Sequence, residues 1–337
     1  MGVVIVNEAL KEDLVIVDSL TKVFLVKQPI IDIITRKPQK VLKAVDNVSL
    51  VIKKGETLGL VGESGCGKST LARTIIRLYN PNSGKILFNG VDLAKLNGNK
   101  LRNERKYIQM VFQDPYSSLN PRMSVKDMLM EVLAVHNICN KNEMKKKITD
   151  LLEMVGMSIQ VENRFPGEFS GGQRQRLGIA RALALNPTFI IADEPVSALD
   201  VSIQAQVINL LSDIQRNLDL TLLFISHDLR VVRHITHRVA VMYLGKIVEL
   251  SDTKSLFEKP YHPYSEILIK AAPVLDPRIR TREYVIEGEP PSPINIPTGC
   301  RFHPRCSKAK ELCKTTQPEM IEISTGRMAA CHYPLMV

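Results

Sequence analysis

The sequence predicts an α/β fold built on a buried parallel sheet. Three short apolar runs with few polar interruptions lie among helical patterns, at Thr57–Val61, Phe189–Ala192 and Leu220–Ile225. Strands that are covered on both faces have this composition. A glycine-rich loop follows the first run and leads into a helical pattern over Ser69–Leu78. With 337 residues, 45% of them hydrophobic, the chain is long enough to bury a large core and a smaller appendage.

A second set of segments predicts an antiparallel layer. Stretches of β-branched, partly alternating residues are typical of half-buried strands. They occupy Leu14–Val26, Lys43–Lys53, Lys85–Phe88 and Arg238–Glu249, and the last folds back at Leu244-Gly245.

The middle and the end of the chain depart from this pattern. Between Ser124 and Gly156 apolar residues recur at three- and four-residue steps, which predicts a helical insertion. After about Glu258 prolines accumulate, which predicts a small loop-rich extension. We therefore expect a main domain over residues 1–257, with the insertion at about 115–170, and an extension over residues 258–337.

Composition narrows the function classes. No run approaches the 18 apolar residues of a membrane span, and the first ten residues lack the layout of a signal peptide, so we expect a chain that stays in the cytoplasm. The net charge of +10 comes from scattered lysines and arginines. Since no DNA- or RNA-binding motif accompanies them, we expect no nucleic-acid partner.

The strongest motif is Gly62-Glu-Ser-Gly-Cys-Gly-Lys-Ser69, which fits G-x-x-x-x-G-K-[ST]. Its glycines let the backbone curl, so that N–H groups and a helix N-terminus point at a polyphosphate. Lys68 then reaches the outer phosphates, and Ser69 is a ligand for Mg²⁺. A glycine-rich turn without a ligand is the alternative, and the strand and helix beside the run argue against it.

Further motifs follow in a fixed order. They are Val111-Phe-Gln-Asp114, Phe169-Ser-Gly-Gly-Gln-Arg-Gln-Arg176, Phe189-Ile-Ile-Ala-Asp-Glu194, Ser197-Ala-Leu-Asp200 and Ser226-His-Asp228. Together with the phosphate-loop motif they resemble the ABC ATPase family over roughly residues 20–257. The resemblance implies an ABC-type P-loop nucleotide-binding domain with a RecA-like core, an antiparallel β subdomain and a helical insertion. It also implies ATP hydrolysis with ATP and Mg²⁺ bound.

The resemblance assigns a role to particular residues. The implied nucleotide contacts are Phe24, Gly62, Glu63, Ser64, Gly65, Cys66, Gly67, Lys68, Ser69, Thr70, Gln113 and His227. The implied Mg²⁺ ligands are Ser69, Gln113 and Asp193. Glu194 is expected to orient and deprotonate the attacking water, with Gln113 and His227 as further catalytic residues. Phe24 stands where the family usually has a tyrosine that stacks on adenine, and a core aromatic is the equally open alternative.

Two loops are expected to act across a dimer. Ser170, Gly171, Gly172 and Gln173 resemble the family's signature loop, and Ser197, Ala198, Leu199 and Asp200 its D-loop. In the family two subunits pack head to tail, so the signature loop of one closes over the ATP in the phosphate loop of the other. The helical insertion faces the membrane subunits.

The extension points to a subclass. Tyr261-His-Pro-Tyr264, Gly288-Glu-Pro-Pro-Ser-Pro293 and Gly299-Cys-Arg-Phe-His-Pro-Arg-Cys306 resemble the C-terminal extension of dipeptide and oligopeptide importer ATPases. This implies two permeases, a second ATPase, an extracytoplasmic substrate-binding protein, and a place on the cytoplasmic face of the membrane. A related nickel or glycoside importer, and less readily a soluble ABC ATPase outside transport, stay open.

The last 40 residues hold four of the six cysteines: Cys300, Cys306, Cys313 and Cys331. In a cytosolic chain such clustering suggests a metal before disulfides. The spacings of five, six and seventeen residues are longer than those of most zinc knuckles. Members of the resembled group imply a [4Fe–4S] cluster, with zinc or unligated thiols as alternatives. We expect this site to lie at a distance from the ATP site.

Overall fold

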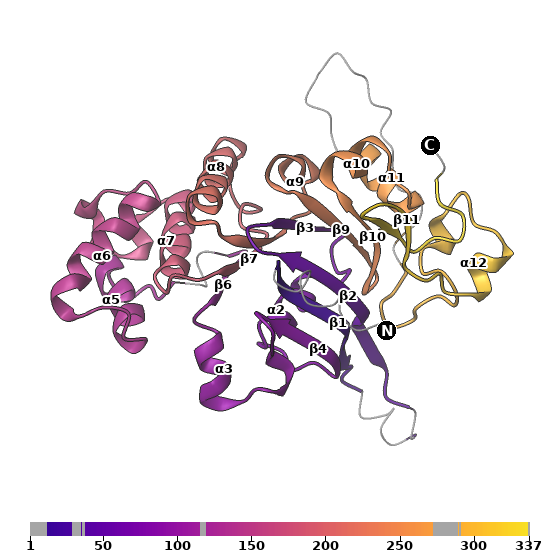
Figure 1. Ribbon diagram of the computed structural model, residues 1–337, viewed down its shortest axis with the longest axis horizontal. Coiled ribbons are helices and arrows are strands. Elements are labelled where there is room, and N and C mark those ends of the chain that lie inside the picture. The colour runs from indigo at the N-terminus through magenta and orange to yellow at the C-terminus, as the bar shows by residue number, and fades with distance from the viewer. Residues whose placement is uncertain are drawn as a thin grey trace, which may run out of the picture. The chain divides into compact units, whose positions relative to one another are not determined.

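The computed structural model describes residues 12–28, 35, 38–114, 119–271, 289 and 291–335 (Figure 1). The chain forms two compact units. Unit 1 comprises Met1–Leu14, Ile52–Thr57 and Lys95–Ser226, and unit 2 comprises Val15–Val51, Leu58–Ala94 and His227–Val337. None of the helices in the described ranges is both long and apolar enough to cross a membrane.

Unit 1 is built on parallel strands. They are β6 (Ile108–Val111), β7 (Phe189–Asp193) and β8 (Thr221–Ile225), in the order β8-β7-β6. All residues of β7 and β8 are buried, which confirms the two apolar runs predicted there as strands covered on both faces. The sequence did not predict β6, which has only four residues and so too little pattern to read.

The predicted helical insertion is confirmed. Helices α5 (Val125–Val135) and α6 (Lys141–Met154) pack against each other and against α7 (Gly171–Leu183). Ser124 caps α5 by accepting a hydrogen bond from the Asp127 N–H. Unit 1 also holds α3 (Gly98–Glu104), α8 (Val201–Leu218) and the short 3₁₀ turns η3 (Ile159–Val161) and η4 (Pro166–Glu168).

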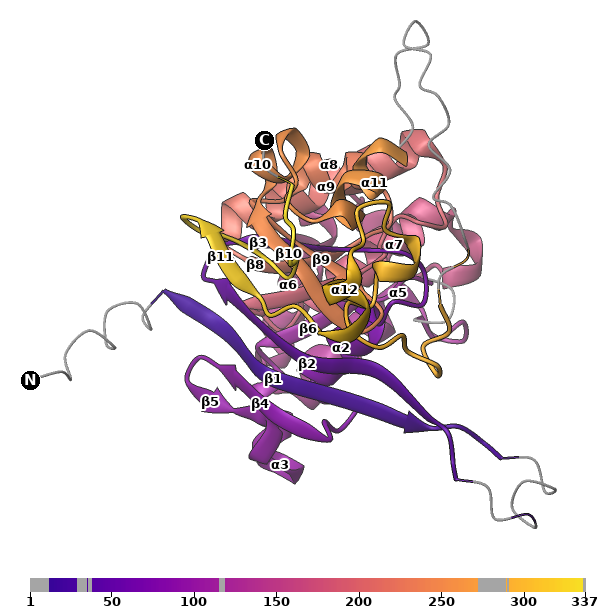
Figure 2. The ribbon, with the colours of Figure 1, turned by 90° about the vertical axis from the view of Figure 1, so that its right-hand side faces the viewer.

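Unit 2 contains the predicted antiparallel sheet. Its strands run in the order β2-β1-β4-β5, formed by Val41–Lys53, Asp13–Leu25, Ser83–Phe88 and Val91–Asp92. Figure 2 shows β1 and β2 as long neighbouring ribbons with β4 beside β1. The turn η2 (Leu93–Lys95) follows β5.

The prediction that Arg238–Glu249 belongs to that layer was wrong. Strand β9 (Arg238–Tyr243) instead lies parallel to β3 (Thr57–Val61), with Leu58 opposite Arg238, and β10 (Lys246–Asp252) pairs with β9. The reason is burial, because every residue of β9 after the first is buried, as in a strand covered on both faces. The turn at Leu244-Gly245 was predicted correctly, and both residues have positive φ, as a tight hairpin requires.

Helices of unit 2 flank these strands. They are α2 (Lys68–Ile75), α9 (Leu229–Ile235), α10 (Thr253–Glu258) and α11 (Pro263–Ala271). Helix α2 is shorter than the predicted 69–78 because Arg77 adopts a left-handed conformation with φ of 61°.

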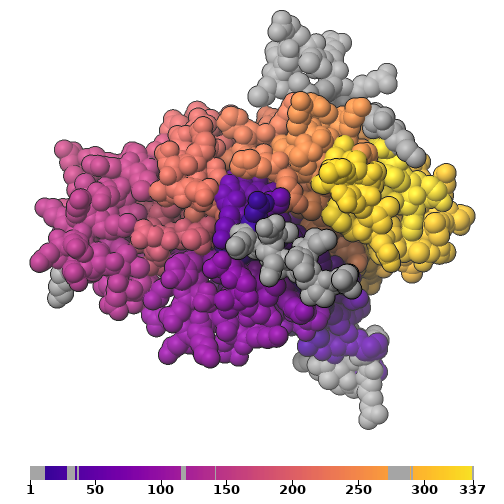
Figure 3. Space-filling model, in the orientation of Figure 1, coloured from indigo at the N-terminus to yellow at the C-terminus, as the bar shows by residue number. Residues whose placement is uncertain are grey.

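The C-terminal segment has more regular structure than its prolines predicted. It contains η5 (His303–Arg305), α12 (Glu311–Thr315), β11 (Ile321–Ser324) and β12 (Arg327–Ala329). Strand β12 pairs with β10, and β11 with β12, so the run β11-β12-β10-β9-β3 belongs to unit 2 (Figure 2). In Figure 3 this segment, in yellow, packs directly against the orange segment that precedes it. The domain boundary at 257/258 stays a prediction.

Candidate nucleotide-binding site

The phosphate loop connects β3 to α2 in unit 2. Backbone carbonyl groups of β2 and β9 lie directly against it. A Cβ at Gly62 would lie 2.1 Å from the Met242 carbonyl oxygen, and one at Gly67 would lie 2.1 Å from the Ala44 carbonyl oxygen. Both glycines also have positive φ, 151° and 111°. Only glycine fits at these two positions, so the loop is held tightly between β2 and β9.

The lysine of this loop lies inside it. Lys68 is only 4% exposed, and its ammonium donates to the carbonyl oxygens of Gly62 at 2.8 Å and Glu63 at 2.9 Å. A buried cation surrounded by carbonyl groups suits an anionic ligand, since the same donors can turn to phosphate oxygens. Burial raises the pKa of the neighbouring Cys66 thiol despite Lys68 nearby, so Cys66 is a small neutral side chain here.

The other predicted residues of this loop are more accessible. Ser64 and Gly65 are exposed, whereas Ser69 and Thr70 are half-buried on the first turn of α2. The Thr70 carbonyl accepts a hydrogen bond from the Thr74 hydroxyl at 2.7 Å. A phosphate-binding loop needs an accessible tip whose N–H groups can reach the ligand, and this loop has one.

Phe24 lies on β1 and is half-buried. Its ring meets Tyr79 edge-on at 5.4 Å, and the Lys22 ammonium lies 4.9 Å from its centroid. The predicted contact with adenine stays a prediction.

Unit 1 brings three predicted residues together at the end of β7. Asp193 is the last residue of that strand and is 1% exposed, a position where a carboxylate is costly unless a cation or hydrogen bonds compensate. Glu194 follows with φ of 47°, and its N–H donates to the Ile225 carbonyl at 3.0 Å. The Gln113 amide donates to the Glu194 carboxylate at 3.0 Å. A left-handed glutamate is strained, and such strain gathers at functional sites.

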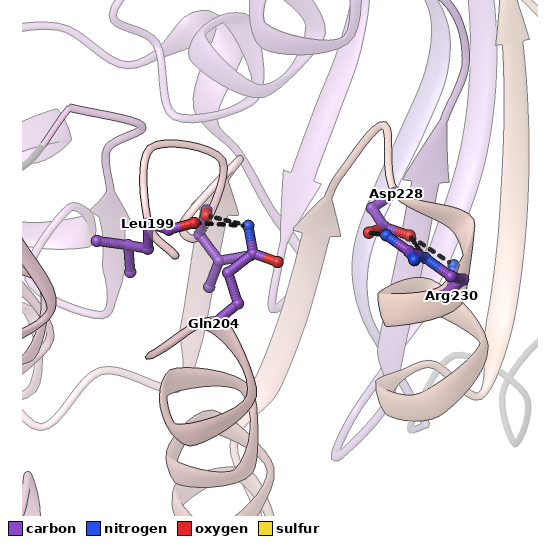
Figure 4. A network of polar contacts seen from close by, with 5 residues as sticks. Leu199, Gln204, Asp228 and Arg230 are labelled. Carbon is purple, nitrogen blue, oxygen red and sulfur yellow. Dashed lines mark hydrogen bonds and ion pairs between the residues drawn. The ribbon is translucent and has the colours of Figure 1, made fainter. Parts of the chain in front are cut away.

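The predicted D-loop starts from the same glutamate. The Ser197 hydroxyl donates to the Glu194 carbonyl at 3.1 Å, while Ala198 and Asp200 are exposed. From α8, the Gln204 amide donates to the carbonyls of Val196 and Leu199 at 3.0 and 2.9 Å, as Figure 4 shows. We did not predict Gln204 as a site residue, although it lies in a short motif, Ser202–Gln206, that resembles the family.

The predicted signature loop begins α7 in unit 1. Ser170 and Gln173 form a capping box, in which the Gln173 side chain accepts from the Ser170 N–H at 3.0 Å. Both side chains are exposed. Behind them, a Cβ at Gly171 would lie 3.1 Å from Leu199 and one at Gly172 would lie 2.3 Å from Ile203. The signature loop therefore packs on the D-loop and α8 through side chains.

The predicted switch histidine borders the phosphate loop in unit 2. His227 and Gly62 line one cavity of about 320 Å³, together with Asp228, Leu229, Arg230, Leu268 and Ala271. Asp228 caps α9 and receives the Arg230 guanidinium on both carboxylate oxygens, at 3.0 and 2.7 Å (Figure 4). These hydrogen bonds hold the pKa of Asp228 below its usual value. His227 therefore shares a cavity with the first glycine of the phosphate loop, and its contact with the γ-phosphate stays a prediction.

The four cysteines of the extension line one small pocket. Cys300, Cys306, Cys313 and Cys331 share it with the side chains of His303 and His332, among others. Burial, with the neighbouring thiols adding to it, raises the pKa of Cys331 to about 11. Within the described ranges, however, no group of three or more His, Cys, Asp or Glu side chains is arranged to hold a metal ion, and all six cysteines are free. The structure thus gathers the thiols, and the predicted metal site is not confirmed.

Two family models match the chain. The ABC transporter model covers residues 45–197, and the model of the oligopeptide/dipeptide transporter C-terminal region covers residues 248–313. The probable peptide ABC transporter ATP-binding protein y4tS of Sinorhizobium fredii is 56% identical over 292 residues, which are 87% of this chain and 83% of that protein. The oligopeptide transport ATP-binding protein AppF of Bacillus subtilis is 55% identical over 86% of this chain and 89% of its own length. The chain belongs to the oligopeptide/dipeptide ABC transporter ATP-binding family.

Solved structures agree on the fold of this ABC ATPase. The dimeric ATP-binding cassette MJ0796, in a post-hydrolysis state with ADP and Pi, matches with a TM-score of 0.62 at 28% identity, over 71% of this chain and 98% of that one. The cassette cbiO1 of Clostridium perfringens matches with the same TM-score at 27% identity, over 73% and 91%. The predicted ABC cassette fold is confirmed, and the chain is an ATPase.

The oligopeptide/dipeptide C-terminal model explains why this ABC ATPase continues past its cassette. The match begins in β10 and ends at Cys313, so it includes three of the four clustered cysteines. The segment that gathers the thiols is therefore shared with a transporter family and is not an isolated appendage.

Proposed function

We propose that this ABC ATPase powers the uptake of dipeptides or oligopeptides. The match of residues 248–313 to the oligopeptide/dipeptide transporter C-terminal region carries the proposal, and the peptide-transport names of the relatives support it. In this function the chain works with two permeases, a second ATPase and an extracytoplasmic substrate-binding protein. It then lies at the cytoplasmic face of the membrane, where its own residues meet ATP and not the peptide.

Each unit carries residues with a proposed role in hydrolysis. In unit 2 the phosphate loop and Lys68 bind the β- and γ-phosphates, with His227 as a hydrogen-bond partner of the γ-phosphate. In unit 1 Asp193 and Gln113 would be ligands of Mg²⁺, which would supply positive charge to the transferring phosphoryl group. Glu194 accepts the proton of the attacking water. Gln113 supports this role because its amide already donates to the Glu194 carboxylate.

The signature loop completes the site of a second subunit. Exposed Ser170 and Gln173 at the start of α7 support this role, since a helix N-terminus with accessible polar groups suits a phosphate. ATP then joins the two ATPases, because a ligand bound by both partners stabilises their dimer.

The test is transport in a defined membrane. The chain is expressed with its permeases, purified as a complex and placed in vesicles with its substrate-binding protein inside. We expect ATP hydrolysis to rise when dipeptides or short oligopeptides are added to the binding protein, and not when nickel or glycosides are added. A complex that responds only to nickel or a glycoside would contradict peptide transport and leave the ATPase assignment intact.

We propose in addition that the four clustered cysteines bind a [4Fe–4S] cluster, with zinc as the alternative. The shared pocket supports this, because it brings all four thiols to one cavity. Protein purified without oxygen is expected to be brown and to hold about four iron atoms per chain. Stoichiometric zinc without iron would refute the cluster and indicate a zinc site. A metal-free protein with an ordered extension would refute both.

A further inference from the structure

Glu63, the second residue of the phosphate loop, is held at three points. Its carbonyl accepts the Lys68 ammonium at 2.9 Å from inside the loop. Its N–H donates to the Tyr264 hydroxyl at 2.9 Å, and its carboxylate accepts both guanidinium nitrogens of Arg305, at 2.8 and 3.0 Å. Tyr264 and Arg305 belong to the extension predicted over residues 258–337, so two of the three anchors lie 201 and 242 residues away in sequence. No contact between the extension and the phosphate loop was predicted from the sequence, and the expected distance between the four-cysteine site and the ATP site stays a prediction.

These two anchors are rigidly placed. Tyr264, in α11, is fully buried, and its ring lies 4.6 Å from Tyr243 and 5.3 Å from Phe302. The Arg305 side chain in η5 is 5% exposed, and its guanidinium also donates to the Tyr243 hydroxyl at 3.4 Å. Aromatic packing of this kind fixes the ring positions, and a buried two-pronged arginine contact adds directional hydrogen bonds to the charge attraction.

The Glu63 contacts also bear on how the loop meets an anion. The Glu63 N–H is committed to Tyr264 and its carbonyl points at Lys68, so the orientation of this residue is set from both sides. The Glu63 carboxylate is paired with a cation, which removes a negative charge that would otherwise repel a polyphosphate at the same loop. Leu268 and Ala271 of α11 further line the cavity that contains Gly62 and His227.

We propose that Tyr264 and Arg305 are positioning residues for ATP binding, and that the C-terminal extension thereby supports the phosphate loop. The extension holds Glu63 so that the loop keeps its binding conformation and its charge balance. If the extension only bound other subunits, it would need no contact with this loop. The proposal rests on the assignment of residues 62–69 as the phosphate loop of the ATPase.

The test compares single and double variants of the full chain. Arg305→Met removes the guanidinium and leaves the half-buried Glu63 carboxylate without its cation. We therefore expect the Kd of a fluorescent ATP analogue and the KM for ATP to rise about tenfold, the size of one lost charged hydrogen-bond contact. Because Arg305 touches no reacting atom, kcat at saturating ATP is expected to stay within about twofold. Arg305→Lys restores part of the affinity. In Glu63→Gln/Arg305→Met, the loss is smaller than in Arg305→Met, since no carboxylate is left unpaired.

Two further variants distinguish the loss of the Glu63 contact from the effect of a changed net charge and from a failure to fold. Lys314→Met makes the same charge change in the extension, at a lysine paired with Glu311 on the surface, and should leave the KM for ATP unchanged. If Arg305→Met fails to fold in a melting experiment, Tyr264→Phe keeps the ring and removes the Glu63 acceptor, and its KM for ATP should rise about threefold or more.

The proposal is overturned by unchanged ATP affinity in both Arg305→Met and Tyr264→Phe, or by an equal loss in Lys314→Met. A failure of the underlying assignment looks different: Lys68→Ala would then bind ATP as well as the unaltered chain.

Discussion

The phosphate loop and the signature loop are both glycine-rich starts of a helix, yet they are supported in opposite ways. Behind the phosphate loop lie backbone carbonyls of Met242 and Ala44, and its lysine is buried. Behind the signature loop lie the side chains of Leu199 and Ile203, and its polar residues are exposed. Backbone cannot move aside, whereas a side chain can change rotamer. The first loop is therefore held rigidly, whereas the second can adapt, which suits its proposed contact with a second subunit.

The strongest loss of activity is expected from a change that leaves both loops intact and removes the proposed catalytic carboxylate. Glu194→Gln keeps the hydrogen bond to Gln113 possible but loses the proton acceptor, so we expect kcat to fall by about 10²–10⁴-fold with little change in ATP affinity. ATP-bound dimers should accumulate in size-exclusion chromatography. The matched control is Glu153→Gln on the exposed face of α6, which should hydrolyse ATP normally. Normal turnover in Glu194→Gln would contradict its assignment, provided that no paralogous second site masks the loss.

A pair of variants tests whether the two loops act in different subunits. Ser170→Arg alters an exposed residue, so the chain should fold and bind ATP in its own phosphate loop while hydrolysis is lost. Lys68→Ala should lose ATP binding directly. Mixed together, the two inactive variants should regain hydrolysis, because one composite site in each mixed dimer is intact. Mixed dimers that form, as tagged copies can show, and stay inactive would exclude the shared site.

One added methyl group in each loop probes the two kinds of support. Gly67→Ala meets a backbone oxygen and has φ of 111°, so we expect it to cost about 1–3 kcal/mol of stability and most ATP affinity. Gly172→Ala meets only atoms of the Ile203 side chain, of which Cγ2 is the nearest, so it should cost less, about 1 kcal/mol. Adding Ile203→Ala, which removes the Cγ2 methyl, should relieve the Gly172→Ala variant. Urea unfolding of these variants measures the costs, and equal costs at both glycines would mean that the two loops are supported alike.

A milder effect is expected at the contact between the D-loop and α8. Gln204→Leu removes two hydrogen bonds to the carbonyls of Val196 and Leu199, which should cost about 1–2 kcal/mol and slow hydrolysis a few-fold. Gln206→Leu, on the exposed side of the same helix, is the control and should hydrolyse ATP as the unaltered chain does. Nucleotide affinity should not change in either variant, because the phosphate loop keeps its own support.

Local patterns in the sequence were enough to predict the features that neighbouring residues encode. Continuous apolar runs identified β3, β7 and β8, and three- and four-residue steps identified α5 and α6. Spacing within a few residues indicated the phosphate loop, and the resemblance to the ABC ATPase family indicated the signature loop and the Asp193–Glu194 pair. Each of these elements is formed by neighbours in the chain.

The meeting of distant segments, in contrast, became visible only in the folded chain. The fold places β9 beside β3 and not in the antiparallel layer, and it adds β11 and β12 to the edge of β10. It sets Arg305 on Glu63, and it collects four cysteines around one pocket without the geometry of a metal site among the described residues. No local pattern could predict these pairings, because a strand or an arginine carries the same local signal whichever partner it finds. The choice of partner depends on burial and packing summed over the whole unit.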